Sequence, residues 1–244
     1  MFPNKIPIVS KAPATGFSNT QSMALDGVDD YLSVADNSAI DLTANMTISV
    51  WLYMNDMNDA GAGSDQEIFI KSSAYRAFWI TSSGRKIRFR VYPNDNSTID
   101  TDAISEAGSD AWVHFAFTYK KVGTNSDEMR IYQNGSEIKN TTSANTGDMT
   151  SNSNPLTIGG STTGDFKGKM DEFAIWNEVL DADAISAVYN SGVPFDLTED
   201  KGNYDEYTDG LVGYFRFEGD FSDSSDTGLT GTATNDASIA TASP

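Results

Sequence analysis

The chain contains no cysteine and a single histidine, His114, among its 244 residues. The absence of cysteine excludes disulfides, thiol nucleophiles and thiolate metal sites, so packing alone must stabilise the fold. A zinc site or a Ser-His-Asp triad would need partners that one histidine without cysteines cannot provide. We therefore expect His114 to have a structural role.

Basic residues are scarce, because 16 Lys and Arg stand against 35 Asp and Glu and give a formal charge of −19. Such a surface repels phosphate backbones, so we expect no nucleic-acid partner. Long apolar runs are also missing. The N-terminus lacks the apolar segment of about 7–15 residues that a signal peptide requires, and no stretch is long enough to cross a membrane. We expect a protein made in a cytoplasm, without membrane insertion.

Several segments show the two-residue alternation of sheet strands. Hydrophobic residues make up 39% of the chain and aromatic residues 11%, which is enough for a sizeable core. The alternation is clear in four segments: 46–54, 86–92, 112–120 and 170–176. Asn134-Gly135 is a strong hairpin turn signal, because both residues tolerate positive φ. One short helix is indicated, with Asp181 as N-cap and Gly192 as its stop.

The strand at 170–176 carries two adjacent acids. Strict alternation predicts that Asp171, Phe173 and Ile175 share one face and that Glu172 lies on the other. Neighbours on opposite faces cannot act as a catalytic pair.

Four motifs resemble those of laminin-G-like, concanavalin A-type jelly rolls. They are the opening SMALDGVDDYLSV (Ser22 to Val34), the Tyr-x-Asn-Gly hairpin ending at Gly135, the Gly-x-Met-Asp-Glu strand (Gly168 to Glu172) and the Tyr-Asn-Ser-Gly helix end (Tyr189 to Gly192). The resemblance implies an all-β fold: a two-sheet antiparallel jelly-roll sandwich with one short helix.

The sequence predicts a single domain, since all-β sandwiches commonly run to about 200–250 residues. Residues 1–16 contain Pro3, Pro7 and Pro13 and favour an extended arm, or else a disordered tail. Residues 17–244 would form one jelly roll. The segment from Leu211 resembles one that normally opens these modules, so we expect 211–244 to supply a permuted strand and a polar tail. The alternative is a truncated second module, although so short a segment cannot bury a core of its own.

Five residues are candidates for ligand binding. Trp51 and Tyr53 lie on the second face of the 46–54 strand, where they would form a stacking platform unless loops cover them. Arg88, Arg90 and Tyr92 share a strand face and would contact a glycan or an acidic neighbour, unless they are an ordinary solvated face.

The resemblance also implies one structural Ca²⁺ between the opening turn and the closing strand. Asp171 would be a side-chain ligand, with the Gly27 carbonyl and Asp26 or Asp29 completing the set. Calcium takes about 6–8 oxygen ligands, which such loops supply. Alternatively, Asp171 only forms hydrogen bonds to the opening turn.

The expected function is structural or binding and not enzymatic. Glucanases of this architecture carry a Glu-x-Asp-x-x-Glu strand with a carboxylate pair, and the chain has no such motif. The resemblance to stand-alone laminin-G-like phage proteins implies a bacteriophage virion surface component: a capsid decoration, fibre or adsorption protein. Its partners would be other virion proteins or further copies of itself in a homo-oligomer. The alternative is an extracellular carbohydrate-binding module or adhesin that recognises cell-surface glycans.

Overall fold

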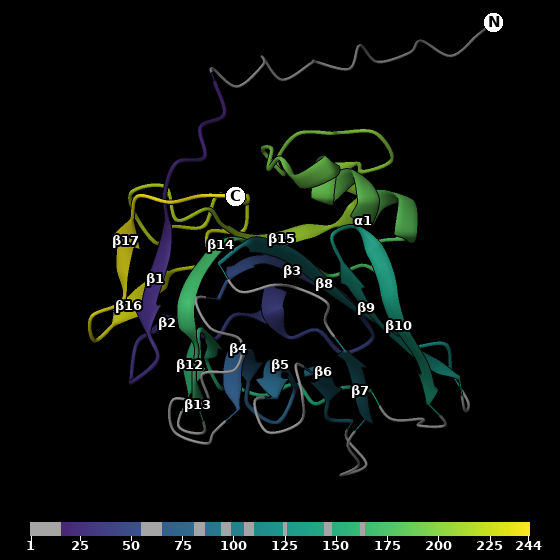
Figure 1. Cartoon of the computed structure of the whole chain (residues 1–244). Coiled ribbons are helices and arrows are strands. Elements are labelled where there is room, and N and C mark those ends of the chain that lie inside the picture. The colour runs from purple at the N-terminus through teal and green to yellow at the C-terminus, as the bar shows by residue number, and fades with distance from the viewer. Residues whose placement is uncertain are drawn as a thin grey trace, which may run out of the picture.

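The protein is a sandwich of two antiparallel sheets (Figure 1). The computed structural model describes residues 16–54, 65–80, 86–93, 99–104, 110–123, 126–143, 148–161 and 164–244. The expected all-β jelly roll is thus confirmed. The predicted N-terminal arm lies outside the described residues, except for Gly16.

The first sheet, called sheet A, lies at the top of Figure 1. Its strands run in the order β10 (Ser136–Ser143), β9 (Asp127–Gln133), β8 (Trp112–Lys120), β3 (Asn45–Tyr53), β14 (Lys167–Trp176), β1 (Ser22–Asp26) and β17 (Ser238–Ala240), and β15 (Leu211–Phe215) also pairs with β14. β14 is therefore bonded to three strands.

The second sheet, called sheet B, forms the lower layer. Its order is β16 (Gly231–Thr234), β2 (Tyr31–Val34), β11 (Leu156–Ile158), β4 (Gln66–Lys71), β5 (Tyr75–Ile80), β6 (Lys86–Val91) and β7 (Ile99–Ile104). The short hairpin β12 (Gly160–Ser161) and β13 (Gly164–Asp165) stands beside β4. A short 3-10 turn, η1 (Ser38–Ile40), follows β2.

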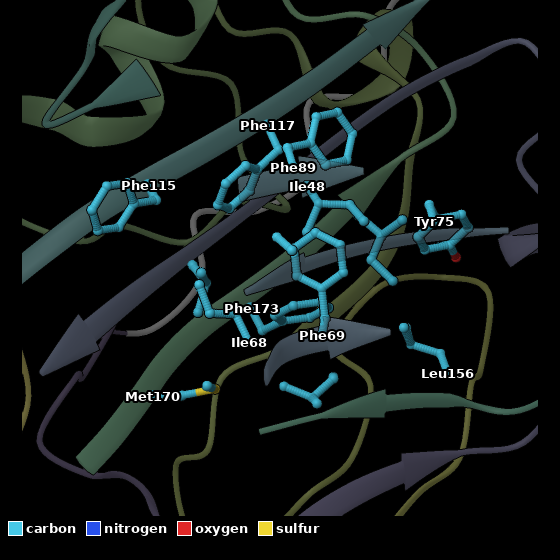
Figure 2. Packing of buried hydrophobic residues seen from close by; sticks show 14 of the residues in the cluster. Ile48, Ile68, Phe69, Tyr75, Phe89, Phe115, Phe117, Leu156, Met170 and Phe173 are labelled. Atoms are coloured by element: carbon cyan, nitrogen blue, oxygen red, sulfur yellow. The ribbon is translucent and has the colours of Figure 1, made fainter. Parts of the chain in front are cut away.

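The core fills the space between the inner faces of the two sheets (Figure 2). Phe69 of sheet B packs edge-on against Phe117 and Phe173 of sheet A, with ring centroids 5.5 and 5.8 Å away. All three side chains are fully buried. The alternation in the sequence therefore sends every second residue of these strands into one shared aromatic cluster.

Helix α1 (Ala182–Tyr189) covers the outer face of sheet A (Figure 1). Asp181 is its N-cap, as predicted, and its carboxylate accepts the backbone N–H of Ala184 at 2.8 Å. The C-cap is Asn190 in the left-handed region, and a 3-10 turn η3 (Asn190–Gly192) follows. A one-turn helix, α2 (Glu206–Asp209), lies in the connection that leads to β15.

Strict alternation fails at one point in β14, where the pairing with β3 shifts register between Asp171 and Ala174. Glu172 adopts φ = +49°, so the strand has a bulge there. Met170 and Phe173 both point into the core. Asp171 and Glu172 consequently both lie on the outer side, and the prediction that Asp171 shares a face with Phe173 is wrong.

The C-terminal segment is built into both sheets. β15 pairs with β14 and β17 pairs with β1 in sheet A, whereas β16 pairs with β2 in sheet B. Ser243 near the C-terminus donates to the backbone oxygen of Asn19 at 3.0 Å. The two ends of the described chain therefore meet beside sheet A.

Phe117→Ala tests the aromatic cluster. The substitution would leave a cavity among Phe69, Phe89 and Phe115, and we expect the free energy of unfolding to fall by about 3–5 kcal/mol. Urea denaturation followed by tryptophan fluorescence measures it. Val122→Ala, at a 48% exposed position, should change stability by less than about 0.5 kcal/mol. Equal effects of the two substitutions would contradict this assignment of the core.

Candidate functional site

A groove of about 670 Å³ lies on the outer face of sheet B. Its floor is formed by Thr157 of β11, Ile70 of β4 and Arg76 of β5, which face one another across the strands in register. Tyr31 of β2 stands on one side, and Tyr92, directly after β6, on the other. Both rings are partly exposed. The groove therefore runs across the strands, with an aromatic side chain toward each end.

Short loops supply polar groups around this floor. Asp29, Asn154 and Asn235 line the groove from three connections, and Asp165 from the end of β13. The side-chain amide of Asn235 donates to the backbone oxygen of Asp29 at 2.6 Å, which holds the two rims together. The lining thus combines aromatic and aliphatic surface with carboxylate and amide groups.

The one cation among the groove residues that the structure describes is already paired. Arg76 Nε donates to Glu67 Oε1 at 3.0 Å, and its Nη2 contacts Glu67 Oε2. Glu67 is 1% exposed, and the guanidinium also lies 4.3 Å over the ring of Phe78. Arg76 therefore offers hydrogen-bond donors and the flat surface of its guanidinium, but Glu67 balances its positive charge.

Arg88 and Arg90, two predicted ligand residues, lie on the same face of sheet B and are paired with β7. Arg88 donates to both carboxylate oxygens of Asp102 at 2.5 and 2.8 Å, and Arg90 to those of Asp100 at 2.5 and 2.7 Å. The hydrogen bonds from Arg88 lower the pKa of Asp102. The sheet itself thus supplies the acidic neighbours of both arginines, and of these predicted residues only Tyr92 lines the groove.

Trp51 and Tyr53, the other two predicted ligand residues, lie on the outer face of sheet A. Trp51 is only 4% exposed, because Tyr189 of α1 covers it at 5.7 Å between ring centroids and His114 lies 5.2 Å away. A helix, not a loop, thus covers Trp51 and makes its ring inaccessible to a ligand. Tyr53 is partly exposed and pairs with Trp112 at 5.5 Å, an aromatic partner that the sequence reasoning did not consider.

His114 is buried below the same helix. Burial lowers the pKa of its imidazole to about 3, so the ring is neutral at pH 7. Its backbone exchanges hydrogen bonds with Asn134, whereas the imidazole Nδ1 has no partner among the described residues. Its environment supports a structural role.

The four residues predicted to bind calcium separate into two groups. Asp26 is paired with Lys167 and Met23 with Met170, so Asp171 lies beyond the other end of β1. Ser22, at that end of β1, is four residue steps from Asp26, which corresponds to about 13 Å. Asp171 therefore cannot share an ion with Gly27, Asp26 or Asp29, and the prediction of one combined site is wrong.

The first group is the opening turn. One carboxylate oxygen each of Asp26, Asp29 and Asp30 lie within 4.8 Å of one another. Asp30, which the sequence reasoning missed although it follows Asp29 directly, accepts the backbone N–H of Asp26 at 3.0 Å and of Asp236 at 2.8 Å. Gly27 has φ = +81° and no room for a Cβ beside Lys167. The hydrogen bonds of Asp30 indicate that it fixes the turn.

The second group is the bulge of β14, which we call the acidic junction: Asn19, Ser22, Asp171, Glu172 and Glu218. β1 and β15 share one edge of β14, and the bulge lies between their pairings. Asn19 donates to Glu172 Oε1 at 2.9 Å, while Glu218 accepts the backbone N–H groups of Thr20 and Gln21 at 2.6 and 2.7 Å. Two distant chain segments thus meet around two buried carboxyls.

The electrostatics of the acidic junction disfavour negative charge. Burial, and next the neighbouring Glu172, raise the pKa of Asp171 to about 9. Burial also raises the pKa of Glu172 to about 8, against the hydrogen bond from Tyr214. Asp171 Oδ2, Asn19 Oδ1 and Ser22 Oγ are buried without a hydrogen-bond partner within the described chain. Arg216 Nε lies 3.7 Å from Glu172 Oε1, and its positive charge acts against the rise in the pKa of Glu172.

Fold and groove together define a two-sheet jelly roll with one covered and one open outer face. The chain belongs to the Concanavalin A-like lectin/glucanases superfamily, whose sequence profile matches residues 26–186. This confirms the resemblance to laminin-G-like jelly rolls. No curated protein matches the sequence significantly.

Among solved structures, the chain is similar to a putative carbohydrate binding protein from Bacteroides ovatus, with TM-score 0.66, 15% identity, and coverage of 91% of this chain and 60% of that one. It therefore spans less than two thirds of that structure. A heptameric SAP-like pentraxin from Limulus polyphemus gives TM-score 0.53 and 14% identity, covering 88% and 96%. The binding domain of botulinum neurotoxin serotype G gives 0.54 and 16%, covering 69% and 42%. At these identities the likeness shows the fold.

Within the described residues, no helix has the length and apolar character needed to cross a membrane.

Proposed function

We propose that the protein is a non-catalytic glycan-binding jelly roll and that the groove on sheet B is its ligand site. The observation that carries the proposal is the composition of the groove. Tyr31 and Tyr92 offer faces for the apolar side of sugar rings, and Asp29, Asn154 and Asn235 offer hydrogen bonds to hydroxyls. The similarity to a putative carbohydrate binding protein supports the same ligand class.

The proposal that the site performs no catalysis rests on the carboxylates. The Glu-x-Asp-x-x-Glu motif of glucanases is absent from the sequence. Asp171 and Glu172, which the bulge brings to one face, are 0% and 3% exposed and lie on sheet A, on the far side of the sandwich from the groove. They are not accessible to a polysaccharide.

Tyr92→Ala tests the ligand site. We expect glycan binding by the protein to weaken about five- to 150-fold, because stacking of a ring on an aromatic side chain is worth about 1–3 kcal/mol in proteins that bind nucleobases. A glycan array followed by calorimetry with the best ligand measures it. Tyr53→Ala, which removes a partly exposed tyrosine from the opposite sheet, is the matched control and should bind normally. A flat array with correctly folded wild-type protein would refute glycan binding.

A second proposed role is display on the surface of a bacteriophage particle, with the groove directed outward to host glycans. Both ends of the described chain lie beside sheet A, on the side away from the groove (Figure 1). Attachment through either end would therefore leave the groove free. The charge of −19 favours a soluble surface component over one in contact with packaged nucleic acid.

Immunogold microscopy of purified particles tests this role. We expect labels at regular positions on capsid or tail, and light scattering of the isolated protein should show a homo-oligomer. Particles free of the protein would contradict the virion role and favour an extracellular adhesin, without affecting the glycan site.

We also propose that one structural Ca²⁺ is held at the acidic junction by Asp171, with Asn19 and Ser22 as the neighbouring oxygen donors. The ion would neutralise the charge of Asp171 and Glu172 and fasten the segment before β1 to the bulge of β14. In this position it would stabilise the fold and take no part in ligand binding.

Calcium should raise the melting temperature, and by more at pH 8 than at pH 5. Without metal, the raised pKa values of Asp171 and Glu172 mean that the folded state holds more protons than the unfolded state, so stability falls as pH rises from about 4 to about 9. The ion binds the ionised carboxylate and offsets this loss. Scanning calorimetry with calcium or EDTA measures both effects.

Asp171→Asn should abolish the response to calcium, whereas Asp29→Asn in the opening turn should keep it. The reverse result would assign the ion to Asp26, Asp29 and Asp30 instead. No response of the wild-type protein would count against a calcium site.

A further inference from the structure

We infer that the groove holds an extended, uncharged stretch of an oligosaccharide chain and discriminates against anionic glycans. The inference rests on the proposed glycan-binding function and goes beyond it, because it commits to the charge and the length of the ligand. Both follow from how the groove is built.

The length follows from the positions of the two tyrosines. Tyr31 is on β2 and Tyr92 follows β6, and the sheet order β2-β11-β4-β5-β6 puts four strand spacings between them. At about 4.8 Å per spacing, the two side chains start about 19 Å apart across the sheet, and the register displaces them by four residues, about 13 Å, along the strands. A single sugar ring cannot contact both. A ligand that uses both tyrosines must be a chain of several rings lying obliquely across the strands.

The floor between the tyrosines suits such a chain. Thr157 and Ile70 lie next to each other in register, followed by Arg76, and none of these side chains is fully exposed. The flat guanidinium of Arg76 is fixed from two sides, by Glu67 and by the ring of Phe78. A rigid floor of this kind can accept sugar rings at little cost in side-chain entropy.

The charge preference follows from the pairing of Arg76. A carboxylate, sulfate or sialic acid on the ligand would need a cation with a free charge, which arginine usually provides. Among the described residues that line the groove, Arg76 is the one cation, and the buried Glu67 already neutralises it. Arg90 of β6, which lies next to Arg76 in register, is paired with Asp100.

The rim strengthens this preference. Asp29 is exposed at the edge of the groove, and Asp26 and Asp30 lie directly behind it in the opening turn. The whole chain carries a charge of −19. An anionic glycan would thus approach a negative rim, and the cation among the described floor residues, Arg76, is already paired, whereas a neutral glycan can donate its hydroxyls to the same carboxylate.

Matched hexasaccharides test the inference. An array would present each neutral hexasaccharide beside its uronate, sulfated or sialylated counterpart, with neutral di- and monosaccharides of the same sugar. At 0.15 M salt we expect the wild-type protein to bind a neutral hexasaccharide at least about tenfold more tightly than its anionic counterpart and its monosaccharide. Tyr31→Ala and Tyr92→Ala should each weaken binding of the hexasaccharide. Each should reduce the affinity for the monosaccharide by a smaller factor, because a single ring contacts at most one of the two tyrosines.

Asp29→Lys tests the charge directly, since it replaces an exposed rim carboxylate by a cation. We expect it to improve binding of the anionic counterpart about two- to tenfold relative to the neutral ligand. Asp183→Lys on α1, an equally exposed acid above the other sheet, makes the same change in net charge and is the control; it should leave the ratio unchanged.

The outcomes separate this inference from the proposed function. Tighter binding of anionic glycans by the wild-type protein overturns the inference and leaves glycan binding intact. Equal affinity for monosaccharide and hexasaccharide overturns the extended occupancy. If no glycan of either charge binds to correctly folded protein, the proposed function itself fails.

Discussion

The pairing of β14 is the constraint on which the rest of the structure depends. One edge of this strand is bonded to β3 along most of its length, and the other edge is divided between β1 and β15. A strand in the middle of a sheet must satisfy its backbone N–H and C=O groups on both edges. Because two separate strands share one edge, a gap is left between them, and the bulge at Asp171 and Glu172 fills it. The N-terminal and C-terminal segments of the fold are joined at this point.

The two outer faces of the sandwich differ in what covers them. On sheet A, α1 and the connection to β15 bury Trp51, Trp176 and Tyr214, so this face acts as a second core. On sheet B the outer face stays open, and its polar row is held by ion pairs within the sheet. A ligand that binds the sandwich through strand residues therefore finds one accessible face, and the chain ends lie on the other.

The arginines on the outer face of sheet B are paired with acids on neighbouring strands. Arg76, Arg88 and Arg90 stand above Phe78 and would repel one another, yet Glu67, Asp102 and Asp100 on the flanking strands oppose them pairwise. Cross-strand pairs of opposite charge stabilise a sheet, and here they balance the charges of these three arginines.

The sequence alone determined the fold class, the strand alternation, the Asn134-Gly135 turn and the Asp181 cap, because these depend on local geometry and on motifs close in the chain. Alternation also placed Tyr92 on the outer face of its sheet, where it lines the groove. Tertiary structure decided the rest. The pairing of Arg88 and Arg90 depends on which strand lies beside β6, the burial of Trp51 on where α1 packs, and the separation of Asp171 from Asp26 on the register of β1 against β14. Each is a contact between residues far apart in the chain, so no local pattern encodes it.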